Sequence, residues 1–316
     1  RWYKNRMNVK LSPINELNGI IPSLHTPFKN NKSIDYKSLE KLVLHTIDTN
    51  CAGMLLSAVA GETQNLTFNE KAEMMEFVLD ISRNIIPIIF GCSSQKIEEI
   101  YSLVDLARQK KIKWVLIQAP LNLSEGDLIA FYKKINEIGP SHLMIQDLSW
   151  DGYGLSDAII QNLMNEVSNF KSLKVEVVNS GKKYSNIINL TQNKLHLTGG
   201  WAATGFIEAM RRGVHGFIPS TMETIYNSVY NLMINNEEKE ARKLFYRILP
   251  AISFAHQHID ISIKFYKMLR VAEEIFSTDV CRGNIQEFDE AQRYEAEFHI
   301  DNILNLQKEL LNKNNK

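Results

Sequence analysis

Lys174-Val175-Glu176-Val177-Val178 is a short, strand-like run in which a lysine and a glutamate interrupt an apolar pattern. Runs of this kind, buried on both faces, are typical of strands in a parallel sheet. Burying an ammonium group without a partner costs several kcal/mol or forces it neutral, and a neutral lysine amine attacks carbonyl carbon. Lys174, which opens the predicted strand, is therefore a candidate for Schiff-base chemistry. The alternative is that Lys174 marks the strand edge and extends to water.

Seven further apolar runs flank this one along the chain, and amphipathic stretches separate them. The runs are residues 19–24, 53–58, 85–91, 114–120, 143–146, 195–200 and 216–220. Between them, apolar positions recur every three or four residues, which predicts helices that include residues 36–49, 69–83, 96–110 and 125–138. Side chains suited to capping stand near several helix starts, at Asp35, Asn69, Ser94, Ser124 and Ser156.

This alternation predicts an α/β fold, the (β/α)8 TIM barrel. Eight strand–helix units occupy roughly 220 residues, close to the usual barrel size of about 250. An open doubly wound sheet is the alternative, but it normally has fewer strands, and the chain lacks a glycine-rich dinucleotide loop after its first strand.

The last part of the chain is predicted to be wholly helical, with helices over residues 238–249, 252–276 and 288–311. His256 and His258 fall within the second of these helices. Two positions apart on a helix, they would point away from one another and would not suit a shared metal ion. The predicted organisation is an N-terminal segment (1–18), a barrel (19–236) and a C-terminal helical region (237–316).

Composition excludes several classes of function. Of the 316 residues, Lys and Arg together number 36 and Asp and Glu also number 36, so no net charge favours nucleic acid or anionic membrane. The apolar runs are far shorter than the roughly 20 residues of a membrane span. Cys51, Cys92 and Cys281 are too few and too widely spaced for a disulfide framework or a zinc site. With no secretory signal in view, we expect a cytoplasmic protein without a metal.

Catalytic groups of a barrel lie at the carboxyl ends of its strands, which narrows the candidates. Lys174 and Glu176 are two positions apart, so their side chains share one face of the sixth strand, and Glu176 is nearer the mouth. The same arrangement also fits a structural ion pair. Gln146 and Asp147 end the fifth run. Thr198-Gly199-Gly200 could hold a phosphate on backbone N–H groups or simply make a tight turn.

Several motifs resemble one family when taken in order along the chain. They are Thr26-Pro27-Phe28, Ala60-Gly61-Glu62 followed by Leu66-Thr67, Ile86-Pro87-Ile88-Ile89-Phe90-Gly91, Lys174, and Gly199 after the seventh strand. The chain resembles, from about residue 19 to about residue 275, the pyruvate-dependent class I aldolases that include dihydrodipicolinate synthase and N-acetylneuraminate lyase. In that resemblance Lys174 matches the lysine that forms the Schiff base.

The resemblance implies a substrate site, in which the chain departs from the family. Val59-Ala60 replaces a Thr-Thr pair, so only backbone N–H groups, those of Ala60 and Gly61, are expected to hold the keto-acid carboxylate. Gln146-Asp147 replaces a Tyr-Asn pair, which removes the tyrosine that moves protons. Glu176, or else Asp147, is expected to take over that role. Asp151 falls about where dihydrodipicolinate synthases have an arginine, which argues against that reaction.

The predicted function is a Schiff-base lyase that acts on pyruvate or a longer 2-keto acid without a metal or dissociable cofactor. Its catalytic residues would be Lys174, Glu176, Gln146 and Asp147. Substrate would be bound by Val59, Ala60, Gly61, Glu62, Gly199 and Gly200. The resemblance also implies a homo-oligomer, a tetramer or a dimer. One alternative is a barrel retained as a 2-keto acid or sugar-acid binding or regulatory protein. Another is a phosphate-binding barrel enzyme that uses Gly199-Gly200.

Overall fold

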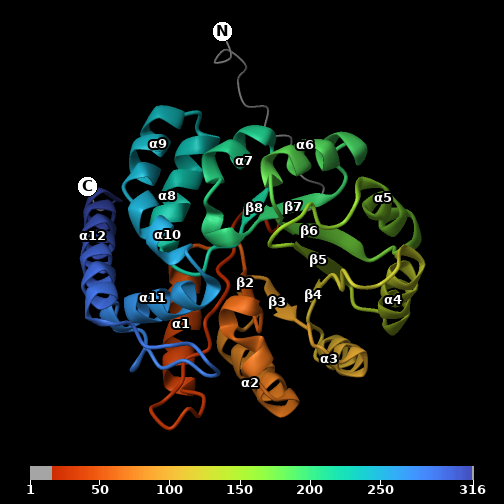
Figure 1. Cartoon of the computed structure of the whole chain (residues 1–316), viewed down its shortest axis with the longest axis horizontal. Coiled ribbons are helices and arrows are strands. Elements are labelled where there is room, and N and C mark those ends of the chain that lie inside the picture. The colour runs from red at the N-terminus through yellow and green to blue at the C-terminus, as the bar shows by residue number, and fades with distance from the viewer. Residues whose placement is uncertain (1–15, 315–316) are drawn as a thin grey trace.

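Eight parallel strands form the centre of the molecule, with helices around them (Figure 1). The computed structural model describes residues 16–314, so most of the predicted N-terminal segment lies outside the described residues. The strands are β1 (Gly19–Ile20), β2 (Met54–Leu56), β3 (Ile88–Gly91), β4 (Trp114–Gln118), β5 (His142–Leu148), β6 (Phe170–Glu176), β7 (His196–Gly199) and β8 (Gly216–Phe217).

The strand order is β1-β8-β7-β6-β5-β4-β3-β2, and backbone contacts just after β1 close the circle. Ser23 forms a parallel bridge with Leu55 of β2. The Leu24 N–H donates to the Leu55 carbonyl (2.9 Å), and the Leu55 N–H donates to the Pro22 carbonyl (2.8 Å). The predicted (β/α)8 barrel with a C-terminal helical extension is therefore confirmed.

One helix follows each strand, and the helix starts agree only in part with the predicted caps. The helices are α1 (Tyr36–Asp48), α2 (Phe68–Ser82), α3 (Ile97–Gln109), α4 (Glu125–Ile138), α5 (Asp157–Glu166), α6 (Ser180–Leu190), α7 (Phe206–Arg212) and α8 (Glu223–Ile234). Asp35, Ser124 and Ser156 cap as predicted. The Asn69 prediction is wrong, because Thr67 caps α2 in a capping box with Glu70. Ser94 is also wrong, since α3 starts after Lys96.

The barrel lumen is filled with apolar side chains at its amino-terminal end. Met144 of β5 belongs to this inner core, together with Leu17, Ile21, Leu55, Ala58, Ile89, Trp114, Leu116 and Ile218. Gln146 is two positions further along β5, so its side chain lies on the same face, nearer the mouth. Buried Ser172 and His196 lie in register with Met144, but charged side chains, Lys174 and Glu176, enter this face of β6 only towards its end. A candidate site is therefore expected at the carboxyl ends of the strands.

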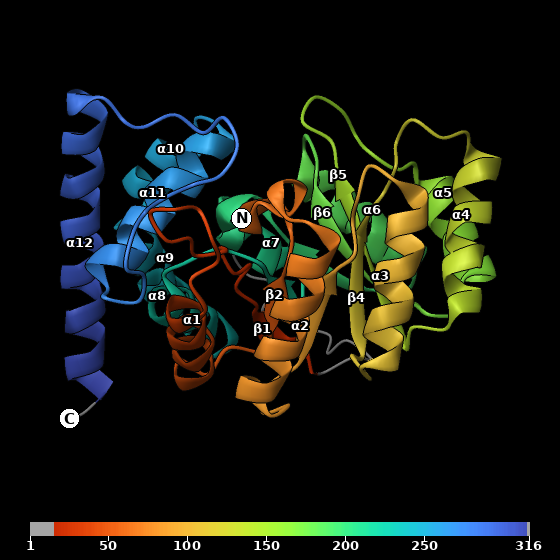
Figure 2. The ribbon, with the colours of Figure 1, turned by 90° about the horizontal axis from the view of Figure 1, so that it is seen from below.

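Four further helices pack against one side of the barrel, α9 (Glu238–Tyr246), α10 (Leu249–Ala255), α11 (Ile259–Ala272) and α12 (Glu290–Asn314). Figure 2 shows α12 along one edge of the molecule, opposite α4 and α5. The prediction of one helix over 252–276 is wrong, because the chain breaks between α10 and α11 at residues 256–258. His258 has an extended backbone there, and its side chain accepts the Asp260 N–H, which starts α11.

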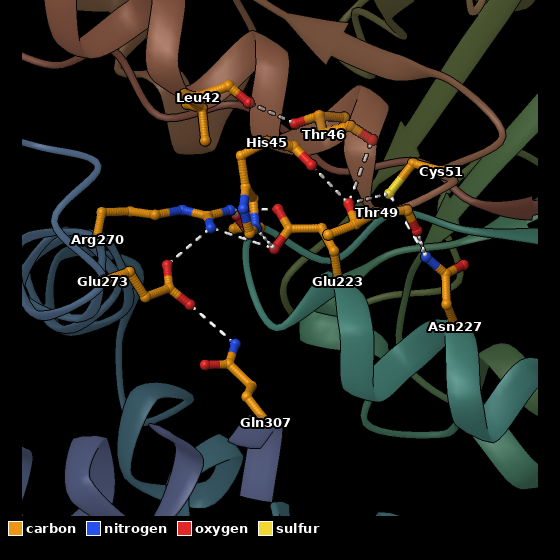
Figure 3. Close-up of polar contacts among 11 residues, drawn as sticks. Leu42, His45, Thr46, Thr49, Cys51, Glu223, Asn227, Arg270, Glu273 and Gln307 are labelled. Carbon is orange, nitrogen blue, oxygen red and sulfur yellow. Dashed lines mark hydrogen bonds and ion pairs between the residues drawn. The ribbon is translucent and has the colours of Figure 1, made fainter. Parts of the chain in front are cut away.

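A buried polar network joins this helical region to the barrel (Figure 3). Arg270 of α11 pairs with Glu223 of α8, and both side chains are fully buried. The Arg270 guanidinium also contacts Glu273 (2.9 Å), which accepts a hydrogen bond from Gln307 of α12 (2.9 Å). Burial alone would raise the pKa of Glu223, but the charges and hydrogen bonds of Arg270 and His45 together outweigh it and hold that pKa well below its usual value. The network thus connects α8, α11 and α12 through charged groups.

Two stacked histidines below the mouth give the fold a predicted pH dependence. Burial lowers the pKa of His196 to about 3 and that of His215 to about 4. In the unfolded chain both titrate near 6.5, so between about pH 6.5 and 4 the unfolded state binds protons that the folded state does not. We expect stability to fall as pH falls through this window, by up to about 1.4 kcal/mol per pH unit for each histidine.

Urea unfolding followed by circular dichroism at several pH values tests this expectation. The Leu197 N–H donates to His215 Nδ1 (2.9 Å), and an asparagine oxygen can accept the same bond. His215→Asn should therefore flatten the pH dependence of the unfolding free energy between about pH 6.5 and 4. A slope equal to that of the wild type would contradict the assignment.

Candidate active site

A cavity of about 540 Å³ opens at the carboxyl ends of the barrel strands. From β5 and β6 it is lined by Gln146, Leu148, Lys174 and Glu176. Ser23, Val59, Ala60, Ile218 and Ser220 come from other strand ends and loops. The helical region closes one side with Ala255, His256, Gln257, His258, Ile259 and Ser262. Barrel and C-terminal helices therefore build the cavity together.

Lys174 and Glu176 lie side by side in this cavity, as strand alternation predicts. Lys174 is the fifth residue of β6, not its first, because the strand begins at Phe170 and ends at Glu176. Its side chain is only 6% exposed, and Nζ lies 3.1 Å from Glu176 Oε2. The ammonium group that the sequence places in the core is thus compensated by a carboxylate on the same strand face.

Three donors hold the Glu176 carboxylate in place. Besides Lys174, Gln146 Nε2 donates to Oε2 (2.6 Å), and the Trp201 N–H donates to Oε1 (3.1 Å). Gln146 on β5 and Lys174 on β6 are paired in register, so the two neighbouring strands bring both donors to the same carboxylate oxygen. The arrangement fixes a carboxylate oxygen within proton-transfer reach of the lysine nitrogen.

Gly200 makes room for this carboxylate. A Cβ atom built on Gly200 would lie 2.0 Å from Glu176 Oε1, which no real side chain could tolerate. Glu176 also borders a second, much smaller cavity of about 30 Å³ between β6 and α7. Gly199, Gly200 and Tyr184 line this second cavity. Gly199 and Gly200 are therefore absent from the lining of the main cavity, and the Trp201 N–H beside them is taken by Glu176.

The sequence predicts that Lys174 forms a Schiff base with pyruvate, which borohydride would trap. Gly200→Ala is expected to displace Glu176 and to slow this trapping at least about tenfold. Gly205→Ala is the matched control, because a Cβ at Gly205 meets nothing within 4 Å on the same loop. Trapping rates followed by intact-protein mass spectrometry compare the two variants. Equal rates would show that the position of Glu176 does not matter to the lysine.

Asp147, which was predicted to be catalytic from its place at the end of the fifth strand, lies outside the cavity. It alternates with Gln146 and Leu148 on β5, so its side chain points outward to α6 and pairs with Lys183 there. The Leu155 N–H also donates to it (2.9 Å). Burial raises the pKa of Asp147 and lowers that of Lys183, because desolvation outweighs their mutual attraction. The pair anchors the loop after β5.

The loop after β2 is also only partly in the cavity. Val59 and Ala60 line it, at the start of a 3-10 turn over Val59–Gly61. The Gly61 N–H donates to the Ala58 carbonyl (3.0 Å), whereas within residues 16–314 neither the Val59 nor the Ala60 N–H has an acceptor. The pair available to a carboxylate is therefore Val59 and Ala60, and not Ala60 and Gly61 as predicted.

Glu62 serves the fold and does not line the cavity. Its carboxylate pairs with Lys267 of α11, and both side chains are almost fully buried. The Arg282 N–H donates to its other oxygen (2.7 Å). Burial lowers the pKa of Lys267, and the nearby carboxylate opposes that shift. These contacts span more than 200 positions of sequence, so no local pattern announces them.

Two histidines and two tryptophans line the rim of the cavity. His256 and His258 line the cavity from the break between α10 and α11, and not from within a helix. Trp150 and Trp201 line it from the loops after β5 and β7. Trp150 is two positions beyond Leu148, so strand alternation could have placed it on the cavity side. Nothing comparable in the sequence marks the break at the histidines.

Residues 16–314 contain neither a cluster suited to a metal ion nor a helix suited to cross a membrane. No group of three or more His, Cys, Asp or Glu side chains in this part of the chain is arranged to hold a metal ion. None of its helices combines the length and the apolar character needed to cross a membrane.

Known proteins resemble the chain over most of its length. The model of the Dihydrodipicolinate synthetase family matches residues 16–302. 4-Hydroxy-tetrahydrodipicolinate synthase of Karelsulcia muelleri (strain GWSS) is 26% identical over 247 residues, 75% of this chain and 82% of that protein. Dihydrodipicolinate synthase from Rhodopseudomonas palustris superposes with a TM-score of 0.85 at 18% identity, covering 93% of this chain and all of that one. Proteus mirabilis N-acetylneuraminate lyase gives 0.80 at 16% identity, covering 92% and 99%.

Proposed function

The chain belongs to the dihydrodipicolinate synthetase family and is a lyase of that family, and from this premise we propose that it forms a Schiff base between Lys174 and pyruvate or a longer 2-keto acid. The family that the sequence motifs resemble is thereby confirmed. The observation that carries the proposal is the buried contact of Lys174 Nζ with Glu176 Oε2 (3.1 Å) in a cavity at the strand ends. A lysine in this setting can give its proton to a neighbour and attack carbonyl carbon.

The proposed reaction begins when the Lys174 amine attacks the keto carbon. Glu176 first takes one proton from the Lys174 ammonium group, which frees the amine for this attack. The former keto oxygen then receives one proton from the nitrogen and the other back from Glu176 and leaves as water, which gives an iminium ion. The Val59 and Ala60 N–H groups receive the carboxylate of the acid. The iminium nitrogen then accepts the electron pair of a breaking carbon–carbon or carbon–oxygen bond, and in the reverse direction the enamine supplies that pair. Gln146 is an amide and cannot itself move protons near neutral pH. Its role is to hold Glu176 in place, through the hydrogen bond from its Nε2 to Glu176 Oε2 (2.6 Å).

The cavity favours a reaction other than that of dihydrodipicolinate synthase. Apart from Lys174, the side chains that line it include neither lysine nor arginine. Asp151, about where the resemblance implies an arginine, is exposed on the loop after β5 and does not line the cavity. Asp147 is no longer a candidate for proton transfer, because its carboxylate faces α6.

Borohydride trapping tests the proposed function. Incubation with pyruvate and borohydride should add one reduced pyruvate, joined to Lys174 as a secondary amine, and peptide mapping should locate it. Lys174→Met should give no adduct. Lys171→Met is its matched control and should give the same adduct as the wild type, because Lys171 is on the same strand three positions earlier and does not line the cavity. An adduct that appears elsewhere, or no adduct with pyruvate or longer 2-keto acids, would contradict the proposal.

A 2-keto acid or sugar-acid binding or regulatory protein is the alternative. It would show saturable binding, and even a trapped adduct, without turnover of any 2-keto acid. The observation that favours this alternative is Gln146, which stands where the resemblance implies the tyrosine that moves protons. Steady-state turnover therefore separates the two functions.

We further place the protein in the cytoplasm as a homo-oligomer, a tetramer or a dimer. The three cysteines, all free thiols, support a reducing compartment. The oligomer is supported by family membership alone, and sedimentation analysis would test it.

A further inference from the structure

Two tryptophans form a stacked wall on one side of the cavity mouth. The rings of Trp150 and Trp201 are nearly parallel, at 17°, with centroids 5.8 Å apart. Trp150 is 57% exposed although it lines the cavity. An exposed tryptophan of this kind supplies a flat apolar surface, and covering that surface with another ring is energetically favourable.

Trp201 is fixed in this position from several sides. Its N–H donates to Glu176 (3.1 Å), and its carbonyl contacts His256 Nε2 (3.1 Å). The His256 ring meets the Trp201 ring nearly edge-on, with centroids 6.0 Å apart. The backbone of Trp201 is left-handed, with φ of 51°, which is unfavourable for a bulky side chain. The same residue therefore positions the proposed catalytic carboxylate and the aromatic wall.

The cavity has more space than pyruvate fills, and its lining residues include no lysine or arginine besides Lys174. A volume of about 540 Å³ is in the range that holds drug-sized ligands, whereas pyruvate has six heavy atoms. Beyond Lys174 and Glu176, the ionisable side chains of the lining are His256 and His258. An anionic substituent would find no permanent positive charge there, but a neutral ring would find the tryptophan wall.

We propose that Trp150, Trp201 and His256 form a subsite for a neutral aromatic ring carried by the aldehyde partner of the reaction. The inference rests on the proposed function and specifies its second reactant. In the condensation direction, Glu176 removes a C3 proton from the iminium ion to give the enamine. C3 of the pyruvate enamine forms a bond with the aldehyde carbon, and Glu176 returns the proton to the aldehyde oxygen, which becomes a hydroxyl group. Water then releases the product, a 4-aryl-4-hydroxy-2-keto acid, from Lys174. Cleavage is the reverse of these steps.

Binding of an unreactive ring tests the subsite without any chemistry. 4-Nitrobenzyl alcohol, which is neutral and aromatic, is titrated into the full chain by isothermal calorimetry, with glycerol and 4-hydroxybutanoate as hydroxylated and anionic probes. The aromatic alcohol should bind at least tenfold more tightly than either. Trp150→Leu should weaken the binding of the aromatic alcohol at least tenfold. Tyr294→Leu, which removes an exposed aromatic ring on α12, should leave the affinity unchanged. Equal affinities for the three probes, or no loss in Trp150→Leu, would overturn the subsite.

Aldol reactions with pyruvate separate the subsite from the proposed function. Benzaldehyde should exceed glyceraldehyde and succinic semialdehyde at least tenfold in kcat/KM. A preference for either of the latter two, with a pyruvate adduct still trapped on Lys174, would overturn the subsite and leave the Schiff-base function standing. Ring binding that depends on Trp150, without any adduct on Lys174, would support the subsite and overturn the proposed function.

Discussion

Lys174→Met should abolish the borohydride-trapped pyruvate adduct and lower kcat/KM for pyruvate-dependent turnover roughly a thousandfold or more. Methionine is unbranched and apolar, so it fills the space of the lysine stem, but it has no amine to attack the keto carbon. The effect is expected to be large because the covalent intermediate itself is lost. Kinetics with the best 2-keto acid substrate, and intact-protein mass spectrometry after trapping, measure the two losses.

The fold should survive this substitution. Glu176 keeps two of its three donors, Gln146 Nε2 and the Trp201 N–H. Circular dichroism of Lys174→Met should therefore still show the native fold, with a lower midpoint of thermal unfolding because the buried Glu176 carboxylate loses its compensating charge. Lys171→Met should keep full turnover. Turnover by Lys174→Met within about tenfold of the wild type would exclude a Schiff base at this residue.

The barrel and the central pair were predictable because both follow from the two-residue period of a strand. Short runs buried on both faces indicate parallel strands, and residues two apart share a face, which places Glu176 beside Lys174. The same period separates Asp147 from Gln146, and applying it consistently would have sent Asp147 outward to Lys183. That error came from treating a strand end as if all of its side chains faced the mouth.

The remaining errors concern contacts that the sequence does not encode locally. Glu62 finds Lys267 only because the C-terminal helices fold back onto the barrel, far along the chain. The break between α10 and α11 contains neither glycine nor proline, so helical periodicity runs through it without a signal. The rim histidines were therefore assigned to a helix. The Trp201 backbone, which is left-handed without being glycine, was equally invisible to the sequence.

Arg270→Met should lower the free energy of unfolding by about 3–5 kcal/mol, the usual result when one partner of a buried ion pair is removed. Arg270 and Glu223 are both fully buried, so the substitution leaves a carboxylate without its compensating charge. It also removes the donor to the Ser220 carbonyl (3.1 Å), and Ser220 lines the cavity. Urea unfolding of the full chain measures the loss.

Two comparisons show that burial, and not charge pairing as such, produces the effect. Arg247 of α9 pairs with Glu309 of α12 (2.6 Å), but both side chains are 48% exposed, so Arg247→Met should lose less than about 1 kcal/mol. Arg270→Met combined with Glu223→Gln should be more stable than Arg270→Met alone, because the fully buried carboxylate of Glu223 is then no longer left without its cation. Equal losses for Arg270→Met and Arg247→Met would show that water reaches the Glu223 site and that the network in Figure 3 does not hold the helical region to the barrel.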